Sequence, residues 1–451
     1  MASISRWFDA KLRLLDVILM IAVMLCGEHC VRTVRGYDPL DPNGKITIRW
    51  DVLQRSGDGT QDVRLSIINY QLFRHIEMPG WKLSWVWPRD EVIWNILGAE
   101  ATEQGNCSAF SGGVLPHCCE RKPVIIDLLP GTSYNKQVAN CCKGGVLSSM
   151  TQGPSKYIAA FQMHIGSESL YNPLPSMPKN FSLGIPGYTC GDPLQVPPTK
   201  SSEDNGRRTT QALATWNVTC TYSQFLALPA PTCCVSLSAF YSETIIPCPK
   251  CTCSCQGQPR AKCVRAGKLP SVLRLKPGER PKPIVQCSDH MCPIKVHWHV
   301  KQNYRLYWRV KITVMNLNYV KNYTEWNLVV LHPNLRNVTQ VFSFNYKPLS
   351  VYGDINDTGM FYGIQYYNDM LLQSGEDGNV QTEMLLSKVP GKFTLREGWA
   401  FPRKISFNGE ECVMPSLDDY PRLPNTGNIH AQVAPLLILS LLLLIEIVFS
   451  S

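Results

Sequence analysis

The stretch from Pro79 to Pro88, "PGWKLSWVWP", places three tryptophans within seven residues. In a strand its alternate residues share one face, and here those residues are Trp81, Leu83, Trp85 and Trp87. Indole rings fill protein cores, but they also present flat apolar surfaces to ligands. The stretch therefore predicts a strand and leaves open whether its tryptophans are structural or functional.

Similar strand-like runs dominate the rest of the chain. Segments rich in Val, Ile, Thr, Tyr and Trp are separated by Gly, Pro, Asn and Asp turns, as at 46–52, 63–71, 91–97, 212–222 and 308–317. Helical periodicity is scarce. Short, regularly spaced strands of this kind predict an all-β fold built from β-sandwiches.

The two halves of the chain contain matching segments. Residues 63–69 (VRLSIIN) match 310–316 (VKITVMN), and WxL at 81–83 matches WxL at 326–328, each followed at the same spacing by proline. "WDV" at 50–52 also matches "WNV" at 216–218. These matches predict two related sandwich modules, although shared β-propensity is an alternative explanation.

If the modules are equivalent, Trp81 corresponds to Trp326 and is expected to be core. Trp85 then corresponds to Val330 and Trp87 to His332. Because Trp85 and Trp87 are aromatic only in the first module, they are the better candidates for function.

Composition divides the chain into five segments. Proline and glycine are concentrated at 171–209, which is typical of an extended linker. We expect the following organisation: a signal peptide at 1–36, a first sandwich at 37–170, the linker at 171–209, a second sandwich at 210–420 with a cysteine-rich insertion at about 233–292, and a removed propeptide at 426–451.

Both ends of the chain carry targeting signals. A basic start precedes the short apolar run 17–26, which is typical of a secretory signal. Near the end, small residues at 425–427 and a polar spacer precede the apolar tail 433–449, which indicates a glycosylphosphatidylinositol (GPI) anchor attached at Asn425. A tail-anchored membrane span is the alternative. The expected location is the extracellular face of the plasma membrane and the cell wall.

Export also accounts for the cysteines and for the glycosylation sequons. The chain has 19 cysteines, and 17 of them follow the expected signal region, so disulfides are expected with one thiol left over. Neighbouring cysteines do not readily bond to each other, so each of the pairs at 118–119, 141–142 and 233–234 should divide between two partners. Six sequons predict N-glycosylation, at Asn106, Asn180, Asn217, Asn322, Asn337 and Asn356.

Three other chemistries are disfavoured. The net charge of +9 is scattered, and an exported protein does not meet nucleic acid. The CxxC at 248–251 and the HWH at 297–299 suggest zinc, but disulfides explain the cysteines better, so we expect no metal and no cofactor. Acidic residues near the tryptophans show no spacing that singles out a catalytic acid and base, so no enzyme activity is expected; they are Asp90, Glu91, Glu100 and Glu103.

Several long motifs resemble the plant COBRA-like proteins over essentially the whole chain. They include "NYQLFRHIEMPGWKLSWVWPRDEVIWNILGAEATEQGNCS" at 69–108, "LLPGTSYNKQVANCCKGGVL" at 128–147, "CCVS" at 233–236 and "FNGEECVMP" at 407–415. The resemblance implies an anchored, non-catalytic wall protein that binds cellulose and helps to organise microfibrils. It also implies that the first module is similar to a cellulose-binding module.

Aromatic side chains of the first module are the candidate ligand-binding residues, because cellulose presents flat faces of sugar rings. They are Trp85, Trp87 and Trp94, with Tyr70 and Phe73 behind them. The chain departs from the resembled family at Ser84, where glycine is general, and at Thr60, where an aromatic is common. If that aromatic helps to hold a glucan chain, affinity is reduced here or the preferred glucan differs.

The expected partners are cellulose or a related β-glucan and the plasma membrane; the sequence does not indicate an oligomeric state. An adhesion or signalling ectodomain that recognises a protein or another apoplastic ligand is the alternative function.

Overall fold

The computed structural model confirms an all-β protein that divides at residue 229 into two compact units. It describes residue 38 and residues 41–421 apart from 111–112, 154, 168–174, 204–207, 225, 228–230, 250–292, 319–320, 336–337, 350–356 and 389–399. The expected signal peptide, the propeptide, Asn425, Asn337 and Asn356 lie outside the described residues. None of the helices it describes combines the length and the apolar character that a bilayer crossing requires.

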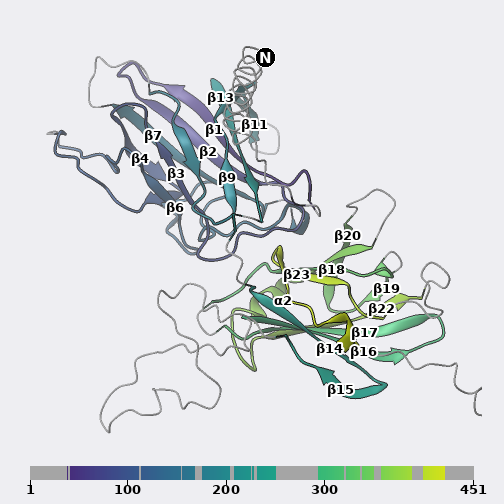
Figure 1. Cartoon of the computed structure of the whole chain (residues 1–451). Coiled ribbons are helices and arrows are strands. Elements are labelled where there is room, and N and C mark those ends of the chain that lie inside the picture. Colours follow the sequence, from purple (N-terminus) through teal and green to yellow (C-terminus); the bar gives the residue numbers. More distant parts are fainter. Residues whose placement is uncertain are drawn as a thin grey trace, which may run out of the picture. The chain divides into compact units, whose positions relative to one another are not determined.

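The first unit contains two main antiparallel sheets (Figure 1). The larger sheet has the order β10-β13-β1-β2-β7-β4, with β9 on β13; its strands are β1 (Ile46–Arg55), β2 (Gln61–Asn69), β4 (Glu91–Leu97), β7 (Ile158–Ser167), β9 (Tyr188–Cys190), β10 (Leu194–Val196) and β13 (Ala214–Tyr222). The smaller has the order β5-β6-β3-β8; its strands are β3 (Lys82–Val86), β5 (Ala99–Ala101), β6 (Val124–Asp127) and β8 (Lys179–Ser182). A separate ribbon joins β11 (Lys200–Glu203) to β12 (Arg208–Gln211).

The second unit also has two sheets. One has the order β15-β14-β16-β17-β22-β19; its strands are β14 (Cys233–Ala239), β15 (Ser242–Ile246), β16 (Ile294–Asn303), β17 (Tyr307–Asn316), β19 (Val338–Val341) and β22 (Asn379–Ser387). The other has the order β20-β21-β18-β23-β24; its strands are β18 (Asn327–Leu331), β20 (Phe344–Leu349), β21 (Thr358–Gly363), β23 (Lys404–Phe407) and β24 (Glu410–Glu411). One short helix, α2 (Gln365–Met370), follows β21.

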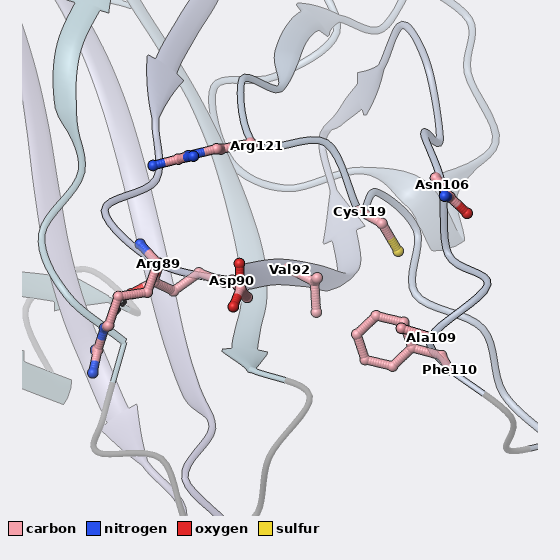
Figure 2. Close-up of a pocket in the computed structure, with 9 residues that line it drawn as sticks. Arg89, Asp90, Val92, Asn106, Ala109, Phe110, Cys119 and Arg121 are labelled. Atoms are coloured by element: carbon pink, nitrogen blue, oxygen red, sulfur yellow. Dashed lines mark hydrogen bonds and ion pairs between the residues drawn. The ribbon is translucent and has the colours of Figure 1, made fainter.

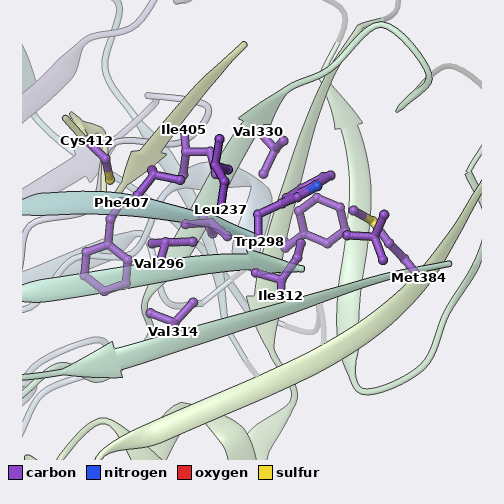
Figure 3. Packing of buried hydrophobic residues seen from close by; sticks show 14 of the residues in the cluster. Leu237, Val296, Trp298, Ile312, Val314, Val330, Met384, Ile405, Phe407 and Cys412 are labelled. Carbon is purple, nitrogen blue, oxygen red and sulfur yellow. The ribbon is translucent and has the colours of Figure 1, made fainter. Parts of the chain in front are cut away.

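Each unit buries one apolar core between its two sheets. In the second unit, β17 alternates strictly between buried and half-buried residues, so one face of the sheet is apolar throughout. Figure 3 shows Trp298 and Ile312 of this sheet packed with Val330 and Phe407 of the other sheet. In the first unit, Trp50 and Leu65 are buried together with Trp85 of β3. Both units are therefore sandwiches whose inner faces are set by period-two patterns.

The predicted duplication is visible in the strand order. Strands β1-β2-β7-β4 correspond to β16-β17-β22-β19, and β3, flanked by β6 and β8, corresponds to β18, flanked by β21 and β23. The segments 63–69 and 310–316 are β2 and β17, at equivalent places. The match of Trp50 to Trp216 is wrong, because these residues are direct cross-strand partners within one sheet. The equivalent of Trp50 is Trp298, since Trp50 faces Leu65 and Trp298 faces Ile312.

The predicted boundary between the modules is also wrong. The supposed linker supplies β8 to β11, and β13, the expected start of the second module, pairs with β1 along seven residues. A disulfide between Cys190 and Cys220 joins β9 to β13. Proline and glycine here mark turns between very short strands, and such strands resemble a linker in composition.

Candidate functional site

The tryptophans of the opening stretch lie in the core. Trp85 and Trp87 are both 0% exposed and Phe73 is 1% exposed, so these three predicted ligand-binding residues have no free ring face. Trp85, Trp87 and Trp50 form an edge-to-face cluster with ring centroids 5.5 to 6.0 Å apart. This arrangement places the positive edge of one ring against the face of the next. The prediction that they stack on a glucan is therefore wrong.

The second unit explains why these positions are structural. His332, the equivalent of Trp87, is fully buried and stacks on Trp298 with centroids 5.5 Å apart. Trp87 contacts Trp50 edge to face, with centroids 6.0 Å apart. Because Trp50 and Trp298 are themselves equivalent, the position requires a flat buried ring in both units.

The two remaining candidates, Trp94 and Tyr70, do not form one platform. Trp94 is partly exposed and Tyr70 is 37% exposed. Ile93, next to Trp94, pairs with Ile165 opposite the start of β2, whereas Tyr70 follows the end of β2. Eight strand residues separate these ends, about 25 Å at ~3.3 Å per residue. Only one of them can contribute to any single small site.

Trp94 has the more distinctive setting. It is the extra residue of a β-bulge in β4, because Ile93 and Asn95 pair with consecutive residues of β7. Bulges turn a side chain away from the regular alternation and are frequent beside functional sites. A Cβ atom on Gly166 would lie 3.0 Å from the indole nitrogen of Trp94 and 2.9 Å from the methyl group of Thr60. Gly166 therefore leaves room for the nitrogen-bearing edge of the Trp94 ring, with Thr60 as its neighbour.

A pocket of about 190 Å³ lies next to this ring. Phe110 connects the two, because it contacts Trp94 edge to face at 5.3 Å and also lines the pocket. Figure 2 shows Phe110 beside Val92, with Asn106 and Cys119 near it. The pocket is lined by Arg89, Asp90, Glu91, Val92, Asn106, Ala109, Phe110, Cys119 and Arg121.

Two features hold the pocket wall in place. The disulfide Cys107–Cys119 closes the loop that carries Phe110. Cys118 exchanges backbone hydrogen bonds with Ile93, at 2.9 and 3.0 Å, so this loop is joined to the edge of the sheet. Cys118 itself is a free, buried thiol whose pKa is raised by burial. The pocket wall is thus held by backbone hydrogen bonds of Cys118 and not by its thiol.

The charged residues of the pocket differ in their availability. Glu91 is buried and accepts hydrogen bonds from the backbone of Arg89 at 2.8 Å and of Ser176 at 3.1 Å. Its carboxylate therefore positions the Arg89 side chain, which also donates to the Ser176 hydroxyl at 2.7 Å. Within the described ranges, neither Asp90 nor Arg121 forms an ion pair. These two side chains are available to bind hydroxyl groups of a ligand.

The cysteine predictions have a mixed outcome. Cys233 pairs with Cys412 and Cys234 with Cys248, so this pair divides as predicted. Cys141 and Cys142 instead bond to each other, which contradicts the prediction. The prediction is also wrong for the 118–119 pair, because Cys119 bonds to Cys107 while Cys118 is free. Positive φ angles at Asn140 and Cys142 give the loop its unusual course. Asp127 stabilises this course by accepting hydrogen bonds from the backbone N–H groups of residues 142, 143 and 145, at 2.9 to 3.0 Å.

The sequons have different accessibility. Asn106, Asn180 and Asn322 are exposed, whereas Asn217 is half-buried within β13, between β1 and β10. Glycosylation of these residues remains a prediction. Asn106 is also at the pocket, so a glycan there would border any ligand bound beside Phe110.

Sequence reasoning missed Phe110 and Arg121. Neither lies in a strand, and no local pattern relates them to Trp94. The sequence feature that could have pointed to Phe110 is the pair Cys107 and Cys119, whose spacing is compatible with a disulfide-closed loop. The spacing does not show that this loop packs against β4. The structure thus defines a two-domain, disulfide-bonded all-β protein with an aromatic, polar-lined pocket on its first sandwich.

The comparisons with known proteins agree with this description. Residues 62–223 match the COBRA N-terminal domain, and residues 232–421 match the COBRA family C-terminal domain. The chain is 58% identical to COBRA-like protein 6 of Arabidopsis thaliana, over 92% of this chain and 93% of that protein. It is 57% identical to COBRA-like protein 1 of Oryza sativa subsp. japonica, over 91% and 92% of the two chains, and 50% identical to Protein COBRA of Arabidopsis thaliana, over 94% and 96%. The chain belongs to the COBRA family.

Proposed function

We propose that the protein is a non-catalytic cell-wall protein, held by a GPI anchor on the outer face of the plasma membrane, that binds β-1,4-glucan and helps to orient cellulose deposition. The binding site in this proposal is the Trp94–Phe110 surface with the adjoining pocket. Membership of the COBRA family supports the class of function, and the terminal signals support the location.

One observation carries the choice of site. Trp94 is the only one of the three candidate tryptophans that is not buried in the core, and it leaves the strand alternation at a bulge. A partly exposed indole beside a polar pocket can contact a sugar face while Asp90 and Arg121 meet its hydroxyl groups. A single such platform binds weakly. An anchor that confines many copies near a fibril would raise the effective concentration and give avidity.

Retention of the purified chain on crystalline cellulose tests this proposal. We expect Trp94→Ala and Phe110→Ala to reduce retention roughly fivefold to tenfold, because each removes part of one aromatic surface. Tyr70→Ala, a partly exposed aromatic at the other end of the sheet, is the matched control and should retain at least half of the binding. Near-ultraviolet circular dichroism establishes that each variant is folded.

Equal retention of Trp94→Ala and the parent would exclude this site. A parent that is not retained at all would favour the adhesion or signalling ectodomain. Substitution of Trp85 or Trp87 requires a stability measurement beside the retention assay, because loss of either ring removes core packing.

A further inference from the structure

The outer face of the six-stranded sheet in the second unit is strongly basic. In β16 and β17 the buried residues alternate with half-buried ones, and the half-buried positions on this face carry four cations. They are Lys295, Lys301, Arg309 and Lys311. The neighbouring strand β22 contributes a single acid to this face, Glu383, which is the cross-strand partner of Lys311.

Glu383 neutralises only part of this charge. Its carboxylate accepts from Lys301 Nζ at 2.6 Å and from Arg309 Nε at 2.7 Å. Lys295 and Lys311 form no ion pair with any residue that the structure describes. Two lysines are therefore left with uncompensated charge on a rigid sheet.

Two imidazoles lie between these lysines. His297 and His299 stack with centroids 6.3 Å apart. The Ser238 hydroxyl lies 2.9 Å from Nε2 of His297 and 2.7 Å from Nδ1 of His299, and the Ser236 hydroxyl lies 2.7 Å from Nδ1 of His297. These buried serines fix both rings in orientation. Both ring nitrogens of His297 are thereby occupied, whereas Nε2 of His299 has no serine partner in the described part of the chain.

The protonation of the imidazoles reflects the surrounding charge. Burial, together with the nearby charges of Lys295, His299 and Lys311, lowers the pKa of His297 to about 4. Burial also lowers the pKa of His299, together with Lys301 and Lys311, against a smaller opposing effect of Glu383. The face therefore disfavours additional positive charge until an anion is present.

The equivalent face of the first unit lacks this excess. There Arg49 and Arg64 are accompanied by Asp51 and Asp62, and Arg49 forms an ion pair with Asp51 at 3.1 Å. The basic character is thus specific to the second unit and does not follow from the shared fold.

We propose that this face binds an acidic, carboxylated polysaccharide of the polyuronate type. The choice of a polyuronate among anionic ligands rests on the proposed cell-wall location. The expectation that this face binds an anionic ligand rests on its charge alone. Lys295 pairs with Met315, and Lys311 lies four residues from Met315 on β17. The two uncompensated lysines are therefore about 13 Å apart along the strands, which suits an extended chain of repeated carboxylates. His299 and Thr313, which lie beside these lysines on the same face, offer polar contacts to hydroxyls and carboxylates.

Retention on immobilised polygalacturonate tests the inference, with its fully methyl-esterified form and phosphatidylserine vesicles as comparison probes. We expect the secreted chain to bind the acidic polymer, to lose binding as salt rises, and not to bind the neutral ester. Lys295→Gln with Lys311→Gln should weaken binding roughly fivefold to tenfold, since each half-buried cation contributes modestly. Lys347→Gln with Lys404→Gln removes the same charge from the other sheet of this unit and should change binding less than twofold.

Bound polymer should also raise the pKa of His297 and His299, which proton magnetic resonance can follow. Equal binding to the methyl ester, an equal loss in both double variants, or binding to vesicles alone would overturn the inference. Cellulose retention should be unchanged in Lys295→Gln with Lys311→Gln, so failure here is distinguishable from failure of the glucan proposal.

Discussion

The two units share a four-strand order, β1-β2-β7-β4 in one and β16-β17-β22-β19 in the other, but differ in what they place on equivalent positions. Asn69 and Asn316 end β2 and β17, are fully buried, and bond to the chain that follows in the same way. Asn69 Nδ2 donates to the carbonyls of Arg74 and Ser148, and Asn316 Nδ2 donates to those of Lys321, Leu371 and Gln373. Buried amides that order a connection are conserved between the halves. The outer surfaces, a pocket in one unit and a basic face in the other, are not.

This difference separates packing from function within one chain. A residue whose counterpart is buried against the equivalent tryptophan, such as Trp87 with His332, is explained by the core. A residue without such a counterpart, such as Trp94 in its bulge, is the better functional candidate. The five predictions below test that separation.

The largest difference is expected from the disulfides. Cys233–Cys412 closes 179 residues, whereas Cys190–Cys220 closes 30. If loop entropy dominates, replacing both cysteines by serine lowers the free energy of unfolding by about 5 kcal/mol in the second unit and about 3.5 kcal/mol in the first. Urea unfolding followed by hydrogen exchange in each unit measures both, and equal losses would show that the enclosed length does not govern stability.

Core substitutions at one equivalent position should have unequal costs. Trp85→Ala removes a fully buried indole and should destabilise the first unit by about 3–5 kcal/mol. Val330→Ala removes a smaller buried side chain and should cost about 2 kcal/mol in the second unit. A Trp85→Ala variant that keeps its stability and loses only cellulose retention would restore Trp85 as a ligand-binding residue.

The buried amides should behave alike. Asn69→Asp and Asn316→Asp keep the shape but replace an N–H donor with an acceptor facing backbone carbonyls. We expect each to lower the free energy of unfolding by about 2–3 kcal/mol, with the larger loss at Asn316, which donates to three carbonyls. Chemical denaturation measures both losses. A loss in one unit alone would show that the two asparagines do not stabilise their units in the same way.

Acid should affect the units in opposite directions. Burial lowers the pKa of His332 from its ordinary 6.5 to about 3, so between these values the unfolded chain binds the extra proton and the second unit loses stability as pH falls. Burial raises the pKa of Asp41 from 3.8 to about 6, so the native first unit binds the proton and gains stability over that range. At pH 4.5 we expect about 2 kcal/mol of loss in the second unit by hydrogen exchange.

Asp41→Asn should remove the gain that Asp41 causes in the first unit. His332→Gln should remove the part of the loss that His332 causes in the second unit and leave the part due to His297 and His299. Parallel pH profiles for the two units would contradict the assignment.

The smallest effect is a gain. Thr60 lies beside Trp94, and its counterpart in the duplication is Tyr307, which packs against Tyr304 with centroids 4.8 Å apart. Thr60→Tyr should extend the aromatic surface next to Trp94 and raise cellulose retention roughly twofold to fourfold. Thr60→Val is the control for bulk. If Thr60→Tyr gives no gain in retention, the glucan does not contact the connection between β1 and β2.

Several features were predictable because they depend on local pattern. Alternation in β17 and in β3 predicts strands with one apolar face, and the match of 63–69 to 310–316 predicts the duplication. The pairing of β13 with β1 was not predictable in this way, since a strand pattern does not specify its partner. The bond between Cys141 and Cys142 depends on a loop that Asp127, fifteen residues away, holds in place.

The sequence by itself determined the all-β class, the disulfide-rich character, the internal repeat and the family. Each of these follows from local properties of the chain: its periodicity, its composition or its long motifs. Only the tertiary structure decided which indoles reach the surface. Alternation identifies residues that share a face, but whether that face meets another sheet or solvent depends on how the strands pack. For Trp85 and Trp87 that partner is the opposing sheet, and for Trp94 a single bulge leaves the ring partly exposed.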